Sequence, residues 1–114
     1  MVSFATDETT TRVAEVLRVP APVLYDHAFH HIAVTWDQRS ISLYVDGDLL
    51  AARVSPGGVL NPATTVPFRI GASSGRGDPI FFRGEADDVS VWSRALTPLE
   101  VAARSLAGQQ AMCV

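Results

Sequence analysis

The chain has 114 residues, of which 47% are hydrophobic and 18% are charged, a composition typical of one globular domain and not of a disordered segment. Nine cationic residues against twelve acidic ones give a net charge of −3 at pH 7, so the sequence predicts no nucleic-acid partner. The one cysteine, Cys113, excludes an internal disulfide bond, and no apolar run approaches the ~18 residues of a membrane span.

Most of the chain has the pattern of short strands divided by turns. Alternating, β-branched and aromatic residues favour strands at residues 2–6, 11–19, 30–36 and 41–45. A turn-rich connection at residues 55–67 and a Gly/Ser loop at residues 73–79 divide the later part. There we expect strands at residues 68–72, 80–82 and 88–92, the last two on either side of a bend at Gly84.

The dipeptide Asp46-Gly47 predicts a hairpin with a type I′ turn, in which both residues take a positive φ. A two-residue turn also fixes the register, because a shift of one residue would move every side chain to the other face. In the expected register Ile41, Leu43 and Leu50 line one face of the sheet, which we expect to be the core. The expected cross-strand pairs are Val45 with Asp48, Tyr44 with Leu49, Leu43 with Leu50, and Ile41 with Ala52.

One helix is expected, near the C-terminus. Thr97 can cap it, Pro98 occupies the first helical position, and Glu100 completes a Thr-x-x-Glu capping box. We expect the helix to run to about Leu106 and to end at Gly108. Many short antiparallel strands and one short C-terminal helix predict an all-β protein, an antiparallel β-sandwich or jelly roll, with residues 1–114 forming one domain.

Several short motifs occur together over about residues 29–106. A His-His pair precedes an apolar strand, a later strand ends in Tyr-Val-Asp-Gly, and "FRIG" follows. The last is "GEADDVSVW", followed by an Arg-Ala-Leu turn and the helix. In this combination the sequence resembles the laminin-G-like, concanavalin A-like jelly roll family, and most closely its bacterial, pentraxin-related branch.

The resemblance implies a non-catalytic recognition module that binds glycan or protein ligands, often with calcium, as part of a longer secreted or cell-surface protein. We expect no signal peptide in this chain and no insertion into a membrane. About 28 residues precede the His-His strand, fewer than is usual in the family, so we expect a shortened domain whose open sheet edges self-associate or pair with another chain. The alternatives are an accessory or degenerate domain of a glycan-processing hydrolase, and a structural or oligomerisation fragment.

The acids at residues 85–88 raise the question of catalysis, because glucanases of the same superfamily carry Glu-x-Asp-x-Glu on one strand. Glu85 and Asp87 match the first two acids of that motif, whereas Val89 at the third position cannot transfer a proton. We therefore expect no enzyme activity. Instead, we expect Asp87 to face inward as a structural residue that accepts hydrogen bonds from backbone amides or from Arg94.

Calcium is the cofactor that the resemblance implies, and it takes six to eight oxygen ligands. The candidate ligands are Asp46, Asp48, Asp78 and Asp88, although solvated turn acids would give the same pattern. Loops of such sandwiches carry function, so Asn61, Arg76 and Asp78 are candidates for ligand binding. The Arg-Gly-Asp tripeptide that contains two of them is interpreted as a chance match.

Histidine and tryptophan have structural interpretations. His27, His30 and His31 lack a zinc-binding spacing, and the latter two would point to opposite faces of a strand, one packed and one exposed. Trp36 and Trp92 lie on or beside strands, and we expect both in the core.

Overall fold

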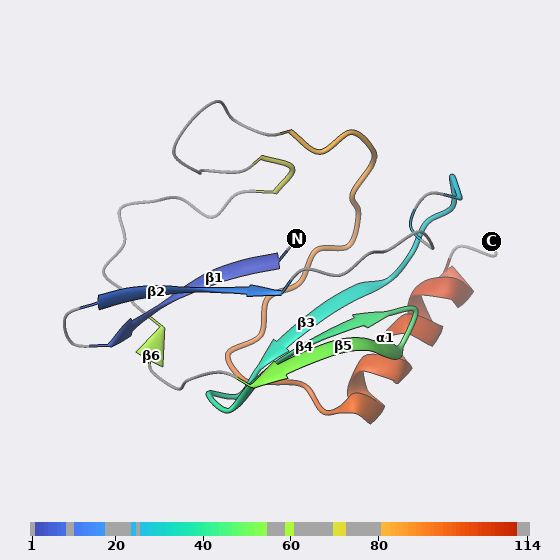
Figure 1. Ribbon diagram of the computed structural model, residues 1–114. Coiled ribbons are helices and arrows are strands. Elements are labelled where there is room, and N and C mark those ends of the chain that lie inside the picture. Colours follow the sequence, from blue (N-terminus) through green and yellow to red (C-terminus); the bar gives the residue numbers. More distant parts are fainter. Residues whose placement is uncertain are drawn as a thin grey trace. The chain divides into compact units, whose positions relative to one another are not determined.

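The computed structural model describes residues 2–8, 11–17, 24, 26–54, 59–60, 70–72 and 81–111. The chain divides into two compact units, of which the first comprises Met1–Asn61 with Trp92–Val114 and the second Pro62–Val91. In the first unit the described residues form six strands and one helix (Figure 1). Their bounds are β1 (Val2–Glu8), β2 (Thr11–Leu17), β3 (Ile32–Trp36), β4 (Ser40–Val45), β5 (Asp48–Val54), β6 (Val59–Leu60) and α1 (Pro98–Ala111).

Each group of three strands makes an antiparallel sheet. One sheet has the order β2-β1-β6, and the other is the meander β3-β4-β5. The strands expected at residues 2–6, 11–19, 30–36 and 41–45 are present, and no end differs by more than two residues. No helix among the described residues is long and apolar enough to cross a membrane.

The short turn between β3 and β4 depends on Asp37. Its Oδ1 accepts hydrogen bonds from the backbone N–H groups of Ser40 at 2.7 Å and Arg39 at 2.9 Å. These bonds to the charged form lower the pKa of Asp37 below its ordinary value, the bond from Ser40 most strongly. Gln38, at the tip, takes a φ of 73°, a value that a turn tolerates better than a strand does.

The β4–β5 hairpin has the predicted turn. Asp46 and Gly47 take φ values of 52° and 89°, and Val45 pairs with Asp48 as expected. Tyr44 also pairs with Leu49 as expected, but the register then shifts by one residue at a bulge.

The bulge changes which residues reach the core. Leu43 pairs with Ala51 and Ile41 with Arg53, so the expected pairs of Leu43 with Leu50 and Ile41 with Ala52 are wrong. The extra residue of a bulge lies outside the regular ladder and re-aims the side chains around it. Leu50 is consequently exposed, while Ala51 packs with Trp36 against the buried pair Ile41 and Leu43.

Helix α1 begins with the expected capping box. Thr97 Oγ1 accepts the Glu100 N–H at 3.3 Å, and Glu100 Oε2 accepts the Thr97 N–H at 2.8 Å. The predicted end at Gly108 is wrong, because the helix continues to Ala111. Among the described glycines only Gly47 and Gly71 have a positive φ, so Gly108 does not take the left-handed conformation that ends a helix.

The helix buries Val101 and Ser105, one turn apart. A Cβ added at Gly47 would lie 3.3 Å from Ala102 Cα and 3.3 Å from Ser105 Cβ. The β4–β5 turn and α1 are therefore in close contact at this glycine, which serves the turn and the packing together.

In the second unit the described residues form less regular structure than expected. Ala72 and Phe81 make one antiparallel bridge, beside a hydrogen bond from the Phe82 N–H to the Gly71 carbonyl at 2.8 Å. The strand predicted at residues 88–92, all of which are described, is absent. Asp88 takes a φ of 52°, which lies outside the extended region, so the backbone is not extended at the first residue of the predicted strand.

Candidate functional site

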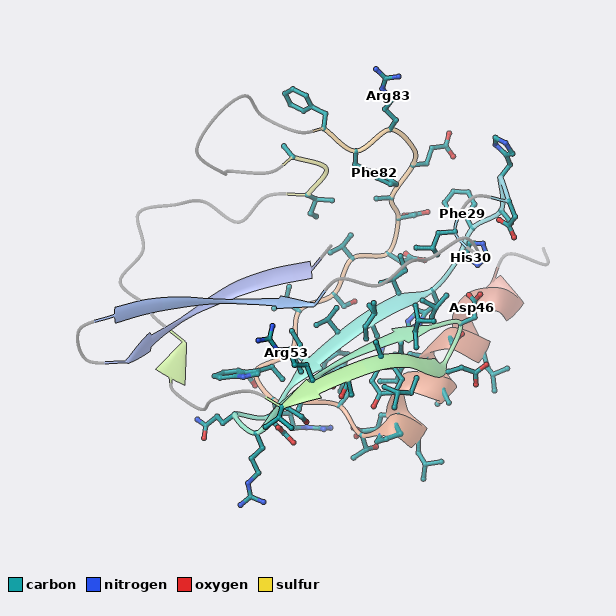
Figure 2. All side chains as sticks on the ribbon, in the orientation of Figure 1. Phe29, His30, Asp46, Arg53, Phe82 and Arg83 are labelled. Carbon is teal, nitrogen blue, oxygen red and sulfur yellow. The ribbon has the colours of Figure 1, made fainter. Side chains whose placement is uncertain are left out.

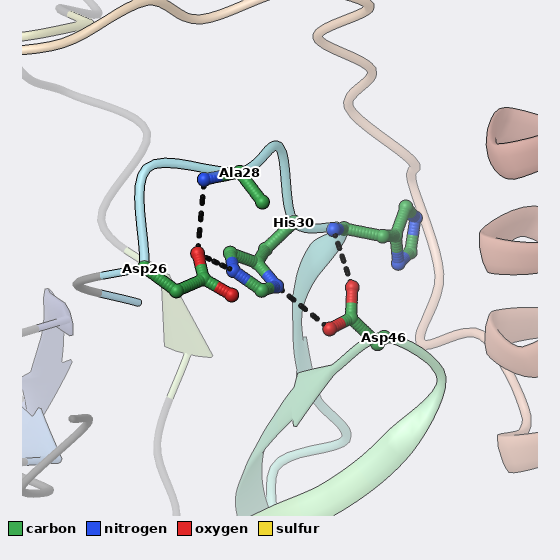
Figure 3. Close-up of polar contacts among 5 residues, drawn as sticks. Asp26, Ala28, His30 and Asp46 are labelled. Atoms are coloured by element: carbon green, nitrogen blue, oxygen red, sulfur yellow. Dashed lines mark hydrogen bonds and ion pairs between the residues drawn. The ribbon is translucent and has the colours of Figure 1, made fainter. Parts of the chain in front are cut away.

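A histidine held between two carboxylates joins the segment before β3 to the β4–β5 turn. His30 Nε2 lies 2.8 Å from Asp26 Oδ1, and His30 Nδ1 lies 2.8 Å from Asp46 Oδ2 (Figure 3). Asp46 also accepts the His31 N–H at 3.0 Å and donates its own N–H to the His31 carbonyl at 2.8 Å. The labelled side chains of His30 and Asp46 face each other in Figure 2.

This arrangement favours the charged form of His30. The hydrogen bonds that its ring donates to Asp46, and next to Asp26, raise its pKa above the ordinary value. The pKa of Asp26 is lowered in turn by its bond to His30 and by the Ala28 N–H, which it accepts at 2.9 Å. Both ring nitrogens are occupied, so the site suits a structural tie better than metal ligation or proton transfer.

Asp46 was predicted from the sequence as a turn residue and as a calcium candidate, but its contact with His30 was not predicted. A signal was present in the hairpin register. Because Ile32 pairs with Val45, the residues just before β3 lie beside the residue just after β4. This places the His-His pair next to the Asp-Gly turn.

The other calcium candidates do not converge in the described residues. Both carboxylate oxygens of Asp46 already accept hydrogen bonds, Asp48 is exposed, and Asp88 is exposed in the other unit. No three His, Cys, Asp or Glu residues in the described ranges gather as a metal site. Asp78, together with the loop candidates Asn61 and Arg76, lies outside the described residues. Calcium binding stays a prediction.

The inward position expected for Asp87 is wrong. Its side chain is exposed, and its Oδ1 accepts the Asp88 N–H at 2.8 Å, a local bond that the positive φ of Asp88 brings within reach. Arg94 pairs instead with Glu100, through Nη1–Oε2 at 2.9 Å and Nη2–Oε1 at 2.7 Å. This pairing and the capping bond lower the pKa of Glu100 to about 2, so Arg94 supports the helix start.

The two tryptophans differ in burial. Trp36 packs against the core as predicted, whereas Trp92 is 44% exposed, so its predicted burial is wrong. The Arg104 guanidinium lies 4.3 Å from the ring centroid of Trp92, a cation–π contact that occupies one face of the ring.

A cleft of about 420 Å³ lies where the β3–β4 part of the sheet meets the start of α1. We call it the hydroxyl cleft, because five of its nine described lining residues carry a hydroxyl group. One side comes from the strands and their turn, and the other from the residues that lead into the helix. The lining residues are Thr35, Asp37, Ser40, Ser42 and Tyr44, and then Ala95, Leu96, Thr97 and Pro98.

The alternation along β4 explains the hydroxyl groups. Ile41 and Leu43 face the core, so Ser40, Ser42 and Tyr44 project from the opposite face. Thr35 joins them because it pairs with Ser42 across the β3–β4 ladder. The sequence "SISLY" contains this alternation, but only the approach of residues 95–98 turns the face into a cleft.

Several of these hydroxyls have unused hydrogen-bonding capacity. Thr97 Oγ1 accepts the Glu100 N–H, and Ser40 Oγ lies 3.4 Å from Asp37 Oδ1. Within the described part of the chain, the side-chain hydroxyls of Thr35, Ser42 and Tyr44 form no hydrogen bond. Tyr44 is only 6% exposed, so packing holds its ring in place.

Comparison with known proteins places this chain in a family. The model of a laminin G family, described as "Concanavalin A-like lectin/glucanases superfamily", matches residues 2–102. The chain belongs to this superfamily. The match confirms the predicted family and the predicted concanavalin A-like jelly roll class, and it begins well before residue 29, where the sequence motifs suggested its start. No curated protein matches the chain.

One solved structure has a fold similar to that of this chain. It is the crystal structure of an S-layer domain-containing protein from Clostridium thermocellum ATCC 27405, with a TM-score of 0.58 and 21% sequence identity. The similarity covers 83% of this chain and 45% of that one. The laminin G-like chain thus spans less than half the length of its solved relative.

Proposed function

We propose that this laminin G-like chain is a non-catalytic recognition module that binds a glycan or protein ligand, and that the hydroxyl cleft is its binding site. The observation that carries the proposal is the cleft itself. It combines hydroxyl groups that lack partners in the described part of the chain with an apolar side, and it lies on ordered elements: two paired strands and a capped helix. Small-molecule sites in proteins typically have this mixture of apolar surface and a few placed polar groups.

The distribution of acids supports binding without catalysis. Glycoside hydrolysis uses two carboxyl groups on either side of the scissile bond, about 5–9.5 Å apart depending on mechanism. Asp37 is the one carboxylate among the described residues of the cleft, and its pKa is lowered, so it is a poor proton donor near neutral pH. Glu85 and Asp87 are exposed in the other unit, and Val89 occupies the third position of the glucanase motif.

We also propose that the chain acts outside the cell or on its surface, as part of a longer protein. The name of the solved relative, an S-layer domain-containing protein, is in keeping with this setting. Calcium is a further prediction for the same module. It would be supported by a higher midpoint of thermal unfolding in calcium chloride than in EDTA.

A glycan array tests the proposed function. The purified chain, labelled with a fluorophore, is applied to printed neutral, sulfated and sialylated glycans and, in parallel, to a panel of purified extracellular proteins. We expect dose-dependent binding to at least one glycan or protein and no release of reducing sugar from any bound glycan. Release of reducing sugar, or no binding to either panel, would contradict the proposal.

A further inference from the structure

The polarity of the hydroxyl cleft indicates which class of ligand it suits. We infer that the cleft binds one pyranose unit of a neutral saccharide and disfavours acidic sugars. This inference rests on the proposed recognition function, because it identifies the ligand class of the same site. It follows from the shape of the lining, the unused hydrogen-bonding groups and the single charge.

The two sides of the cleft differ in character. The strand side presents hydroxyl groups, whereas the side at residues 95–98 contributes Ala95, Leu96 and Pro98. A pyranose ring has the same division, with hydroxyl groups around its edge and C–H groups on its faces. The ring edge would meet the β3–β4 side while a C–H face covers the apolar side. A volume of about 420 Å³ lies at the small end of the range for ligand sites, which suits one ring and not an extended peptide.

The hydrogen-bonding groups match a ligand that both donates and accepts. Serine, threonine and tyrosine hydroxyls can do either, as can each hydroxyl of a sugar. Thr35, Ser42 and Tyr44 have no hydrogen bond from their hydroxyls within the described part of the chain. Tyr44 is 6% exposed, so packing already holds its ring. A ligand that bonds to its hydroxyl therefore costs little side-chain conformational entropy.

Asp37 sets the charge preference. It is the only charged side chain among the described lining residues, and its lowered pKa keeps it ionised at neutral pH. An ionised carboxylate accepts strong hydrogen bonds from neutral sugar hydroxyls. It repels the carboxylate of a uronic acid, and a unit charge about 4 Å away in water changes affinity by about fivefold.

Titration followed by NMR tests this inference on the whole chain. The probes are methyl β-D-glucopyranoside, methyl β-D-galactopyranoside and methyl α-D-mannopyranoside, with D-glucuronate as the acidic counterpart. We expect at least one neutral glycoside to shift the amide signals of Ser42, Tyr44 and Thr97, and the glucuronate to bind about fivefold more weakly than methyl β-D-glucopyranoside. Signals that shift only at residues outside the cleft would overturn the inference.

Two variants remove single hydroxyl groups and leave the remaining packing in place. Tyr44→Phe and Ser42→Ala should each raise the dissociation constant of the bound glycoside by about twofold to tenfold, the loss typical of one neutral hydrogen bond. Ser93→Ala, at an exposed serine outside the cleft, is the matched control and should leave the constant unchanged. Equal binding by all three variants would overturn the cleft assignment while leaving the recognition function intact. If no saccharide binds but a protein on the panel does, the inference fails and the proposed function stands.

Discussion

The contact between the β4–β5 turn and α1 gives a quantitative prediction for Gly47→Ala. Gly47 has a φ of 89°, and an L-residue in the left-handed region costs about 1–2 kcal/mol. In addition, the new Cβ would lie 3.3 Å from the backbone Cα of Ala102, closer than the ~3.5–4.0 Å of an ordinary carbon contact. Overpacking of this kind costs about 1–3 kcal/mol, so the free energy of unfolding should fall by about 2–5 kcal/mol.

Two other glycines separate the conformational cost from the packing cost. Gly71 has a similar φ of 81° with nothing within 4 Å of an added Cβ, so Gly71→Ala should cost only about 1–2 kcal/mol. Gly108 lies in α1, also with nothing within 4 Å, and Gly108→Ala should stabilise the chain by about 0.8–1.0 kcal/mol.

Urea unfolding of these variants, monitored by circular dichroism, provides the measurement. The double variant Gly47→Ala/Ser105→Gly adds a direct test, because removal of the Ser105 Cβ relieves one of the 3.3 Å contacts. We expect a favourable coupling energy of about 1 kcal/mol between the two sites. Equal costs for Gly47→Ala and Gly71→Ala, together with no coupling, would refute the packing of the turn against the helix.

Four further predictions concern stability and association. The pKa of His30 is raised in the folded chain. Its contribution to stability is therefore complete below its unfolded pKa of about 6.5 and is lost as the pH rises through the folded value. In urea unfolding, His30→Gln should lower the free energy of unfolding more at about pH 6 than at about pH 9. The pKa of Glu100 is lowered to about 2, so Glu100→Gln should destabilise the chain at neutral pH. This destabilisation should disappear as the pH falls from about 4.5 towards 2. A loss of stability that does not change with pH in urea titrations would contradict the ion pair with Arg94. Ile41→Ala, at a fully buried side chain, should cost about 2–5 kcal/mol by the same method, and a cost below about 1 kcal/mol would contradict the core assignment. The open sheet edges expected from the sequence predict a larger apparent mass at higher protein concentration in size-exclusion chromatography with light scattering, and a constant monomer mass would count against self-association.

Local signals in the sequence predicted the parts of the structure that depend on neighbouring residues. The Asp46-Gly47 turn and the Thr97-Glu100 capping box are present because their hydrogen bonds and φ values are set within four residues. The end of α1 was mispredicted for a related reason. A glycine only permits the left-handed conformation that ends a helix, and the surrounding chain decides whether Gly108 adopts it.

Features that depend on tertiary contacts escaped prediction. The bulge beside Leu43 changes the hairpin register without a glycine to mark it, and it moved Leu50 out of the core. The apolar pattern at residues 88–92 suits a strand, but the positive φ of Asp88 does not. Hydrophobic periodicity carries no information on the sign of φ, so the missing strand was not predicted.

The candidate site was missed for the same physical reason. His30 meets Asp46 across sixteen residues, and the hydroxyl cleft needs residues 35–44 and 95–98 together. Register could have indicated the histidine contact. The cleft required the position of the helix on the sheet, which no local pattern specifies.

The most direct test of the account is a crystal structure of the chain with the neutral glycoside that binds most tightly. We predict density for one pyranose ring in the hydroxyl cleft, with hydrogen bonds to the Tyr44 hydroxyl and the Asp37 carboxylate and a C–H face against Leu96 and Pro98. A glycoside bound instead at the loop that contains Arg76 and Asp78, with the cleft filled by water, would contradict it.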